Sequence, residues 1–258
     1  MMQSISKKLI NKVSIILPTY NSQRTVSSTI ESVIKQTYGN WELIITDDCS
    51  SDSTLKILKK YSKLDKRIKI FNLEKNSGAG VCRNNSIKQS SGNYIAFIDS
   101  DDLWFPNKLE VQIEFMISNN IYISYTSFEV INLDGKKIDS VISPKKLSYK
   151  DMLLNNYIGC LTVIYDVSFF GKNYMSKIRK RQDWALWLKL LKKVKFAYNA
   201  GKILASYRLN ENSLSKNKFD LVKYNWIIYR KIEGFNFIKS LYYFFIFFMY
   251  HFIKKNKL

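Results

Sequence analysis

From residue 13 onward the sequence alternates four times between a short apolar segment and a segment whose apolar residues recur at helical spacing. The apolar segments have the length of buried strands and comprise residues 13–17, 41–45, 67–71 and 94–98. The expected helices comprise residues 24–36, 54–61, 81–89 and a stretch that begins near Pro106. Such alternation with short links predicts a doubly wound α/β fold, in which helices cover both faces of a mostly parallel sheet.

Polar residues directly follow three of the expected strands. They are residues 18–21, 47–48 and 99–102. Ligands of doubly wound sheets bind beyond the carboxyl ends of the strands, so these segments should meet at one edge although they lie far apart in the sequence. The carboxylates of residues 99–102 repel one another unless a cation neutralises them, which indicates a divalent metal and, with it, a diphosphate. The sequence therefore predicts one active site for a nucleotide-activated substrate.

Composition narrows the choice of partners. The 258-residue chain carries a formal net charge of +20, which favours nucleic acid, anionic lipid or phosphorylated substrates. Its three cysteines, Cys49, Cys82 and Cys160, stand singly and predict neither a disulfide framework nor a zinc site, which fits a reducing cytoplasm. The lone histidine, His251, argues against histidine catalysis. No P-loop pattern is present, which argues against a kinase or ATPase, and we expect no signal peptide in residues 1–12.

Four motifs, taken in order, resemble those of family 2 glycosyltransferases. They are residues 13–21, 45–52, 97–102 and 207–213, with a further match at residues 76–84. The resemblance covers roughly residues 12–215 and is strongest to bacterial surface-polysaccharide transferases of the teichuronic-acid and O-antigen type. It implies the GT-A fold, whose sheet is Rossmann-like, and an enzyme that uses a nucleotide sugar, expected to be a UDP-sugar.

The resemblance also implies roles for single residues on the donor side. Asp101 is expected to hold a divalent metal, Mn²⁺ or Mg²⁺, and Asp99 to contact the metal or the ribose. Arg208, placed in a polar loop, is expected to clamp the phosphates by charge-assisted hydrogen bonds. The other residues that match family positions around the nucleotide and the donor sugar are Pro18, Tyr20, Asp47, Asp48, Arg83, Ser100 and Asp102.

The resemblance places the catalytic base at Asp183. The family's base is an Asp, usually preceded by Glu, that opens a helix containing Trp; here Gln182 stands where Glu is common. Asp183 would take a proton from the acceptor hydroxyl, and attack from the face opposite the leaving group would invert the anomeric centre. Trp184 and Trp187 are expected in the core. The processive subgroup's Gln-x-x-Arg-Trp motif is absent, so we expect transfer of one sugar at a time.

Each assignment has a purely structural alternative. Asp47 and Asp48 precede serines that suit a helix cap, and residues 99–102 are compatible with a solvated turn. Asp183 also suits the positive end of a helix dipole. Tyr20 is also compatible with a role in packing alone. Arg208 is also compatible with a surface cation that has no role in binding.

The last part of the chain differs in character. We expect a glycosyltransferase domain in residues 1–215 and a C-terminal extension, a basic and aromatic-rich helical tail, in residues 216–258. The aromatic run at residues 241–253 is shorter than the ~20 residues that a spanning helix needs. Aromatic residues with flanking lysines suit the bilayer interface, so we expect a helix lying on the cytoplasmic face of the bacterial inner membrane. The alternative is a helix packed on the domain or on a second subunit.

The leading hypothesis is a cytoplasmic, membrane-associated glycosyltransferase with a nucleotide-sugar donor, a lipid-linked saccharide acceptor and no nucleic-acid partner. Two alternatives are a basic nucleic-acid-binding protein and another nucleotide-dependent sugar-phosphate or nucleotidyl transferase. Nucleic acid is disfavoured because the carboxylates at the strand ends repel phosphates and the basic residues form no recognisable module. Specificity is expected to reside in residues 121–175, which carry no recognised motif.

Overall fold

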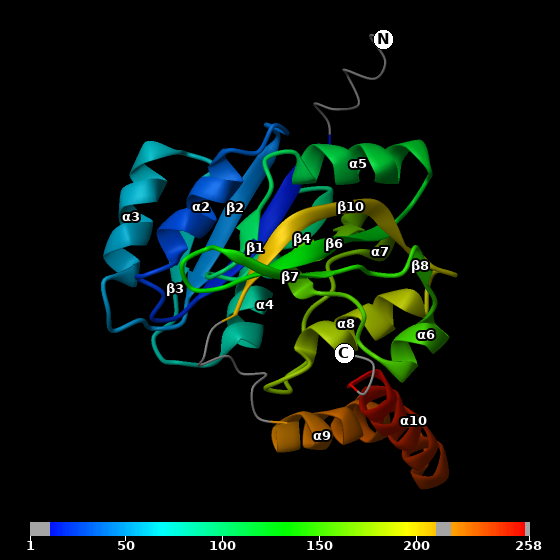
Figure 1. Ribbon diagram of the computed structural model, residues 1–258. Helices are drawn as coiled ribbons and strands as arrows, with labels where there is room; N and C mark the ends of the chain where they lie inside the picture. The colour runs from blue at the N-terminus through cyan, green and yellow to red at the C-terminus, as the bar shows by residue number, and fades with distance from the viewer. Residues whose placement is uncertain (1–10, 210–217, 256–258) are drawn as a thin grey trace.

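The computed structural model describes residues 11–209 and 218–255, and these residues form the expected α/β fold (Figure 1). They build a ten-stranded sheet with helices on both faces. The strands are β1 (Val13–Thr19), β2 (Trp41–Asp47), β3 (Ile68–Asn72), β4 (Tyr94–Phe97), β5 (Leu103–Trp104), β6 (Ile123–Ile131), β7 (Lys137–Val141), β8 (Lys146–Leu147), β9 (Ile164–Asp166) and β10 (Ala197–Arg208). The helices are α2 (Val26–Ile34), α3 (Thr54–Leu64), α4 (Ala79–Gln89), α5 (Lys108–Ser118), α6 (Tyr149–Leu154), η1 (Cys160–Thr162), α7 (Val167–Phe170), α8 (Gln182–Leu191), α9 (Lys218–Ile227), η2 (Ile228–Ile232) and α10 (Phe237–Lys255).

The four strands predicted from the apolar segments lie side by side. The sheet order is β3-β2-β1-β4-β9-β6-β10-β5, and the first four strands in this order run parallel to one another. Beyond β4 the sheet is mixed, because β9 is antiparallel to both β4 and β6 whereas β10 is parallel to β6. The carboxyl ends of β1, β2 and β4 therefore meet at one edge, as predicted.

Alternate residues of the parallel strands face two separate hydrophobic cores. In β1, Ile15 and Leu17 pack with residues of α2, α3 and α5, whereas Ile16 packs with residues of α4, α6 and α8. Successive side chains of a strand point to opposite faces, so a strand covered on both faces is apolar throughout. This explains why the segments that form β1, β2 and β4 are almost continuously apolar in sequence.

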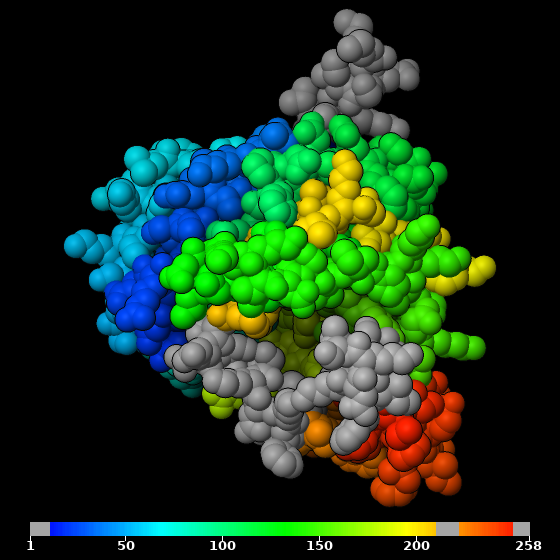
Figure 2. Space-filling model, viewed as in Figure 1, coloured from blue at the N-terminus to red at the C-terminus, as the bar shows by residue number. Residues whose placement is uncertain are grey.

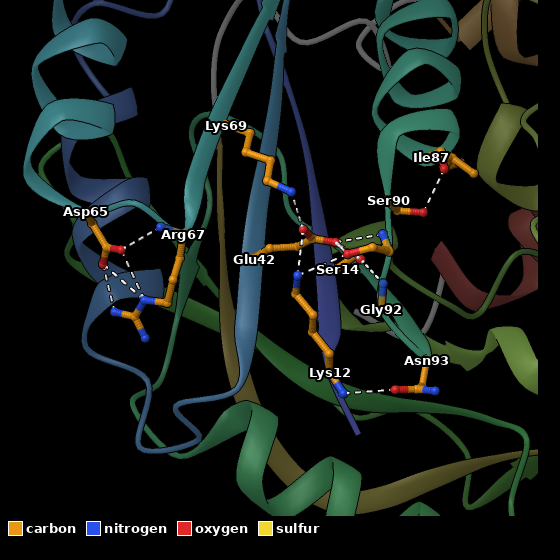
Figure 3. A network of polar contacts seen from close by, with 11 residues as sticks. Lys12, Ser14, Glu42, Asp65, Arg67, Lys69, Ile87, Ser90, Gly92 and Asn93 are labelled. Carbon is orange, nitrogen blue, oxygen red and sulfur yellow. Dashed lines mark hydrogen bonds and ion pairs between the residues drawn. The ribbon is translucent and has the colours of Figure 1, made fainter. Parts of the chain in front are cut away.

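The amino ends of the strands, opposite this edge, carry a buried polar network around Glu42 (Figure 3). The Glu42 side chain is 1% exposed and accepts hydrogen bonds from Lys12 at 2.9 Å and from Lys69 at 2.8 Å. It also accepts from the Ser14 hydroxyl and from the Ser91 amide, both at 2.7 Å. Burial alone would raise the pKa of Glu42, but these hydrogen bonds outweigh burial and hold the pKa well below its usual value.

The C-terminal helices α9 and α10 lie beside α6 and α8, and α10 contacts both (Figure 1). The ring of Phe247 in α10 lies 6.0 Å from the ring of Trp184 in α8. Glu233, just before α10, pairs with Lys192 at 2.7 Å and accepts a hydrogen bond from the Tyr149 hydroxyl. The end of the chain therefore shares a core with the helices that follow the sheet.

Helix α10 has a second apolar face that remains exposed. Figure 2 shows the orange and red C-terminal segment at the surface, at one end of the molecule. Its exposed apolar residues recur at helical spacing, and we call them the α10 apolar stripe: Ile238, Leu241, Tyr242, Phe245, Phe248 and Met249. The packing alternative considered for the tail is thus confirmed for one face of the helix, while the stripe on the other face lies open. Among the described residues, no helix combines the length and the apolar character needed to span a bilayer.

Candidate active site

The loops that follow β1 and β2 are joined by reciprocal hydrogen bonds. The amide of Asn21 donates to the Ser50 hydroxyl at 2.9 Å, and the amide of Ser51 donates to Oδ1 of Asn21 at 2.9 Å. Pro18 is the next-to-last residue of β1, and Tyr20 projects from the loop with 51% of its surface exposed. The half-exposed ring is accessible to a ligand, and its contact with a nucleotide stays a prediction.

The two carboxylates after β2 hold neighbouring loops in place. Asp47 is fully buried and accepts hydrogen bonds from the Thr19 hydroxyl at 2.9 Å and from the amide and hydroxyl of Ser50 at 2.9 and 2.6 Å. Asp48 is 3% exposed and accepts from the amides of residues 77–78, both at 2.7 Å. Both side chains therefore order the loops of this edge, and their contact with a nucleotide stays a prediction.

The carboxylate turn after β4 is held by two other elements. The Thr25 hydroxyl donates to the carbonyl of Ser100 at 2.8 Å, and the Thr29 hydroxyl donates to the carbonyl of Asp102 at 2.9 Å. The amide of Arg208, at the end of β10, donates to Oδ1 of Asp102 at 3.0 Å. The turn is thus an ordered part of the sheet edge and not a solvated loop.

The carboxylates of this turn lie in different environments. Asp102 is 1% exposed, and burial together with the charges of Asp101 and Asp99 raises its pKa well above the usual value. The Asp99 side chain is 33% exposed and pairs with Arg83 at 2.5 Å. Asp101 is also partly exposed. Asp102 therefore serves the structure of the turn, whereas Asp99 and Asp101 are accessible to a ligand.

Arg83 in α4 connects this turn with the start of α8. Its Nη2 pairs with Asp99, and its Nη1 donates to Oε1 of Gln182 at 3.4 Å. Burial by itself lowers the pKa of Arg83, but the charge of Asp99 and, more weakly, that of Asp183 outweigh burial and raise it. A Cβ atom on Gly80 would lie 2.5 Å from the end of the Gln182 side chain, so a larger residue at position 80 would displace the Gln182 amide from its contact with Arg83. Arg83 thus brings the predicted metal turn and the predicted base to one site.

Asp183 lies in the first turn of α8, where the helix dipole favours a carboxylate. Its Oδ2 accepts a hydrogen bond from Nδ2 of Asn156 at 3.2 Å. The helix begins directly after Arg181, whose φ of 64° is in the left-handed region. Trp184 and Trp187 are fully buried, which confirms the expectation that they are core residues.

The structure corrects the placement of Arg208. The sequence predicts it in a polar loop, but it is the last residue of β10 and is 6% exposed. Its Nε donates to the carbonyl of Asp101 at 2.9 Å, and its Nη1 donates to the carbonyls of Asn132 and Leu133 at 3.1 and 2.6 Å. Arg208 therefore supports the carboxylate turn and is not a surface cation, and this geometry does not support a phosphate clamp. Residues 210–213 of the late motif lie outside the described residues.

The carboxylates at the edge fit a divalent metal whose coordination a bound diphosphate would complete. Nowhere in residues 11–209 and 218–255 do three His, Cys, Asp or Glu side chains gather into a metal-binding group. Mg²⁺ commonly takes only one or two protein carboxylates, together with water and substrate phosphates. Asp99 and Asp101 provide two partly exposed carboxylates of this kind. The donor set is therefore appropriate for Mg²⁺ or Mn²⁺ with a nucleotide, and insufficient for a metal held by protein alone.

Asn156 was not predicted from the sequence, and Gln182 was noted only as a departure from the family pattern. Asn156 belongs to a stretch without a recognised motif, and its only signal is a pair of asparagines that resembles any polar loop. Gln182 is 8% exposed, and its Nε2 donates to the carbonyl of Arg179 at 3.2 Å. Both residues owe their importance to neighbours that are distant in the sequence.

Comparison with known proteins identifies the family. The model of the family described as "Glycosyl transferase family 2" matches residues 14–179, which include all three strand-end segments. The chain belongs to glycosyl transferase family 2. This family 2 protein is 46% identical over 229 residues to the "Putative teichuronic acid biosynthesis glycosyltransferase TuaG" of Bacillus subtilis, with 88% of this chain and 91% of the relative covered. It is 44% identical over 215 residues to WfgD of Escherichia coli, with 83% of each chain covered.

Solved structures confirm the fold of this family 2 protein. The crystal structure of S. aureus TarS 1–349 in complex with UDP-GlcNAc superimposes with a TM-score of 0.70 at 21% identity, and the match covers 85% of this chain and 67% of that chain. A longer TarS chain is matched over 40% of its length. The shared fold is GT-A. The protein is therefore a glycosyltransferase, the resemblance to the teichuronic-acid and O-antigen type is confirmed, and the nucleic-acid-binding and nucleotidyl-transferase alternatives are not supported.

Proposed function

We propose that this family 2 glycosyltransferase transfers one sugar at a time from a UDP-sugar to a lipid-linked saccharide in bacterial surface-polysaccharide synthesis, with inversion and with Mn²⁺ or Mg²⁺. The observation that carries the proposal is the position of Arg83, which pairs with Asp99 and contacts Gln182, the residue before Asp183. The relatives support the substrates: WfgD is described as a "UDP-Glc:alpha-D-GlcNAc-diphosphoundecaprenol beta-1,3-glucosyltransferase".

On the donor side, an aromatic ring and several charged side chains at one edge of the sheet suit the binding of a nucleotide sugar. The exposed ring of Tyr20 suits stacking on a nucleobase, and the ordered loops around Asp48 form the wall beside it. A divalent metal held by Asp99 and Asp101 would neutralise the charge that develops on the leaving nucleoside diphosphate. Arg83 adds a fixed cation next to Asp99.

On the acceptor side, Asp183 acts as the general base. Its Oδ2 is held by Asn156, which leaves Oδ1 to take the proton of the acceptor hydroxyl. The deprotonated oxygen of the acceptor hydroxyl then bonds to the anomeric carbon. At the same time the bond between that carbon and the nucleoside diphosphate breaks, and its electron pair leaves with the phosphate. Attack and departure on opposite faces of the sugar invert the anomeric centre.

The α10 apolar stripe supports a peripheral position on the cytoplasmic face of the inner membrane. The stripe places six exposed apolar side chains on one helix face. Their insertion into a bilayer interface would remove apolar surface from water, which favours binding. Exposed cations lie near the stripe at Arg230, Lys231 and Lys239, and the chain as a whole carries +20. Anionic lipid therefore complements the surface in charge as well as in polarity.

The donor site is tested by calorimetric titration of the full-length protein with UDP, with and without Mn²⁺. We expect Mn²⁺-dependent binding that Asp101→Ala weakens about tenfold or more, because a charge-assisted contact contributes at least about 1.4 kcal/mol. Asp134→Ala, which removes an exposed carboxylate in the turn before β7, is the matched control and should bind as the wild type does. Failure of UDP, GDP and dTDP to bind would contradict the proposal.

A further inference from the structure

We propose that the basic segment, residues 177–181, binds the diphosphate of a lipid-linked acceptor between the base Asp183 and the membrane-facing helix α10. The inference rests on the proposed glycosyltransferase function and adds to it the acceptor chemistry and the residues that recognise it. Binding the acceptor through its diphosphate places the attached sugar, rather than the lipid, next to the base.

The basic segment concentrates positive charge immediately before the catalytic helix. Four of its five residues are cationic, namely Lys177, Arg179, Lys180 and Arg181. Lys177 and Arg179 are exposed, whereas Lys180 and Arg181 are partly buried. Guanidinium groups such as those of Arg179 and Arg181 suit the oxygens of a phosphate, which they can contact with two parallel hydrogen bonds.

Arg181 is the member of the segment whose contacts indicate a ligand. Its guanidinium carbon lies 5.5 Å from the ring centre of Trp184 and 5.9 Å from that of Phe247. Among the described residues it forms no ion pair with a carboxylate, and its Nε is buried without a hydrogen-bond partner. Buried donors are normally paired, so this Nε indicates an acceptor group supplied by a ligand.

Other buried polar atoms, on side chains that interact with Asp183 or adjoin the basic segment, also lack partners. They are Oδ1 of Asn156, Oγ of Ser176 and Nε of Arg83. Ser176 directly precedes the basic segment, and residue 175 is fixed to α4 by two hydrogen bonds with Asn84, at 2.7 and 3.0 Å. Buried polar atoms are normally paired, so the unpaired atoms of Asn156 and Arg83, two side chains that interact with Asp183, are consistent with a polar ligand beside it.

The position of α10 favours a lipid-linked diphosphate over a free one. Phe247 contacts both Trp184 and Arg181, so α10 packs directly against the start of α8 (Figure 1). The α10 apolar stripe lies on the other face of the same helix. In a bilayer, the diphosphate of a lipid-linked sugar lies at the level of the headgroups, between the lipid chain and the sugar. Arg181 lies near Phe247 of α10 on one side and interacts with Asp183 on the other, which is where such a diphosphate would have to lie.

The test uses geranyl diphosphate as the probe and the full-length protein saturated with UDP and Mn²⁺, so that the donor site is filled. Calorimetry gives the affinity, and tryptophan fluorescence reports binding near Arg181, since Trp184 lies beside it. We expect binding that Arg181→Gln weakens about tenfold or more, because the variant removes a charge-assisted hydrogen bond to the diphosphate. The exposed pair Lys177→Gln and Arg179→Gln, which removes no packing contact, should weaken it as well.

Lys59→Gln with Lys63→Gln on α3 is the matched control, because it removes the same charge from exposed lysines of the opposite layer. This control should bind the probe as the wild type does. Inorganic pyrophosphate should bind more weakly than geranyl diphosphate, and equal affinity would overturn the lipid-linked part of the proposal.

The outcomes separate this inference from the proposed function. Absence of UDP binding by the wild-type protein would contradict the proposed glycosyltransferase site itself. Normal UDP binding with no binding of geranyl diphosphate, or with unchanged affinity in Arg181→Gln and in the double variant, would overturn only the assignment of the basic segment.

Discussion

Single residues decide how the donor and acceptor halves of the site meet. Arg83 pairs with Asp99 and contacts Gln182, while Gly80 gives Gln182 the space to lie against α4. The side-chain amide of Asn156 donates a hydrogen bond to the carboxylate of Asp183. The proposed base, Asp183, is therefore surrounded by side chains from two other parts of the chain, and we expect its role to depend on their contacts as well as on its own carboxylate.

Asp183→Asn tests the base while preserving shape. We expect the turnover number to fall by roughly 10²–10⁴, because an amide cannot accept the proton of the acceptor hydroxyl. The affinity for UDP should stay unchanged, because Asp183 does not belong to the donor side. Both are measured on the same preparation, as UDP release in the presence of donor and acceptor and as calorimetric binding.

Glu110→Gln is the control for the alternative that Asp183 only complements a helix dipole, since Glu110 occupies the first turn of α5. If Asp183 only complemented the helix dipole, both variants would change the melting temperature slightly and both would keep their turnover. Normal turnover in Asp183→Asn would remove Asp183 from the role of base.

A residue could be placed from the sequence when its environment is set by its own strand, and not when it depends on contacts with residues that are distant in the sequence. Pro18, Tyr20 and the carboxylate turn were found because a strand end fixes their position regardless of the rest of the chain. Arg208 was placed wrongly because its environment depends on β10, whose partner strand lies far away in the sequence. Asn156 carries no local signal at all.

At the scale of elements, the parallel strands are locked at the end opposite the site. Glu42 of β2 binds Lys12 ahead of β1 and Lys69 of β3, and it accepts from Ser91 in the turn before β4 (Figure 3). One buried carboxylate thus fixes the register of four neighbouring strands. The carboxyl edge, where we propose that the nucleotide binds, carries the irregular loops.

Glu42→Gln should lower the free energy of unfolding by about 2 kcal/mol at pH 7, because charged hydrogen bonds to two half-exposed lysines are removed. The folded-state pKa of Glu42 is lowered, so its contribution is fully present above its ordinary pKa of 4.5 and is lost as the pH falls below that value. The difference between wild type and variant should therefore shrink from pH 5 to pH 3 in urea denaturation. Glu74→Gln, at an exposed position, should show no such difference.

Long elements with one clear period were predictable, and short or irregular ones were not. The first four strands and the helices between them were predicted, and the structure confirms them with small shifts of boundary. Strands β5 and β8 have two residues each, which is too short for a pattern. Strand β10 was missed because Gly201 and register shifts against β6 break its alternation.

At the scale of the whole molecule, the sheet edge that we propose to bind the nucleotide and the helix that we propose to meet the membrane belong to one packed structure. The fold class could be predicted because repeated strand–helix units leave few arrangements. The packing of α10 on α8 could not be predicted, because both faces of α10 are apolar and the sequence does not distinguish the buried face from the exposed one.

Substitutions in the α10 apolar stripe test the membrane surface more cleanly than deletion of residues 235–258, which would also remove Phe247 from the core. Ile238→Glu with Phe245→Glu should weaken sedimentation with phosphatidylglycerol vesicles about a hundredfold or more, given the area that two large apolar side chains bury. Added salt should weaken wild-type binding, since the flanking cations are screened. Leu64→Glu with Ile142→Glu, each at a site 72% exposed outside the stripe, should bind as the wild type does. Unchanged sedimentation of the stripe variant would refute the proposal.

The docking of Phe247 and Glu233 on α6 and α8 has a consequence for the order of synthesis. Strands β1 to β4, with their helices, are synthesised before α8 and contain most of the residues that we propose to bind the nucleotide. The helix that carries Asp183 completes its packing only when residues 229–247 have been added. Sugar transfer is therefore expected only after the ribosome has synthesised α10, whose exposed stripe we propose to meet the membrane.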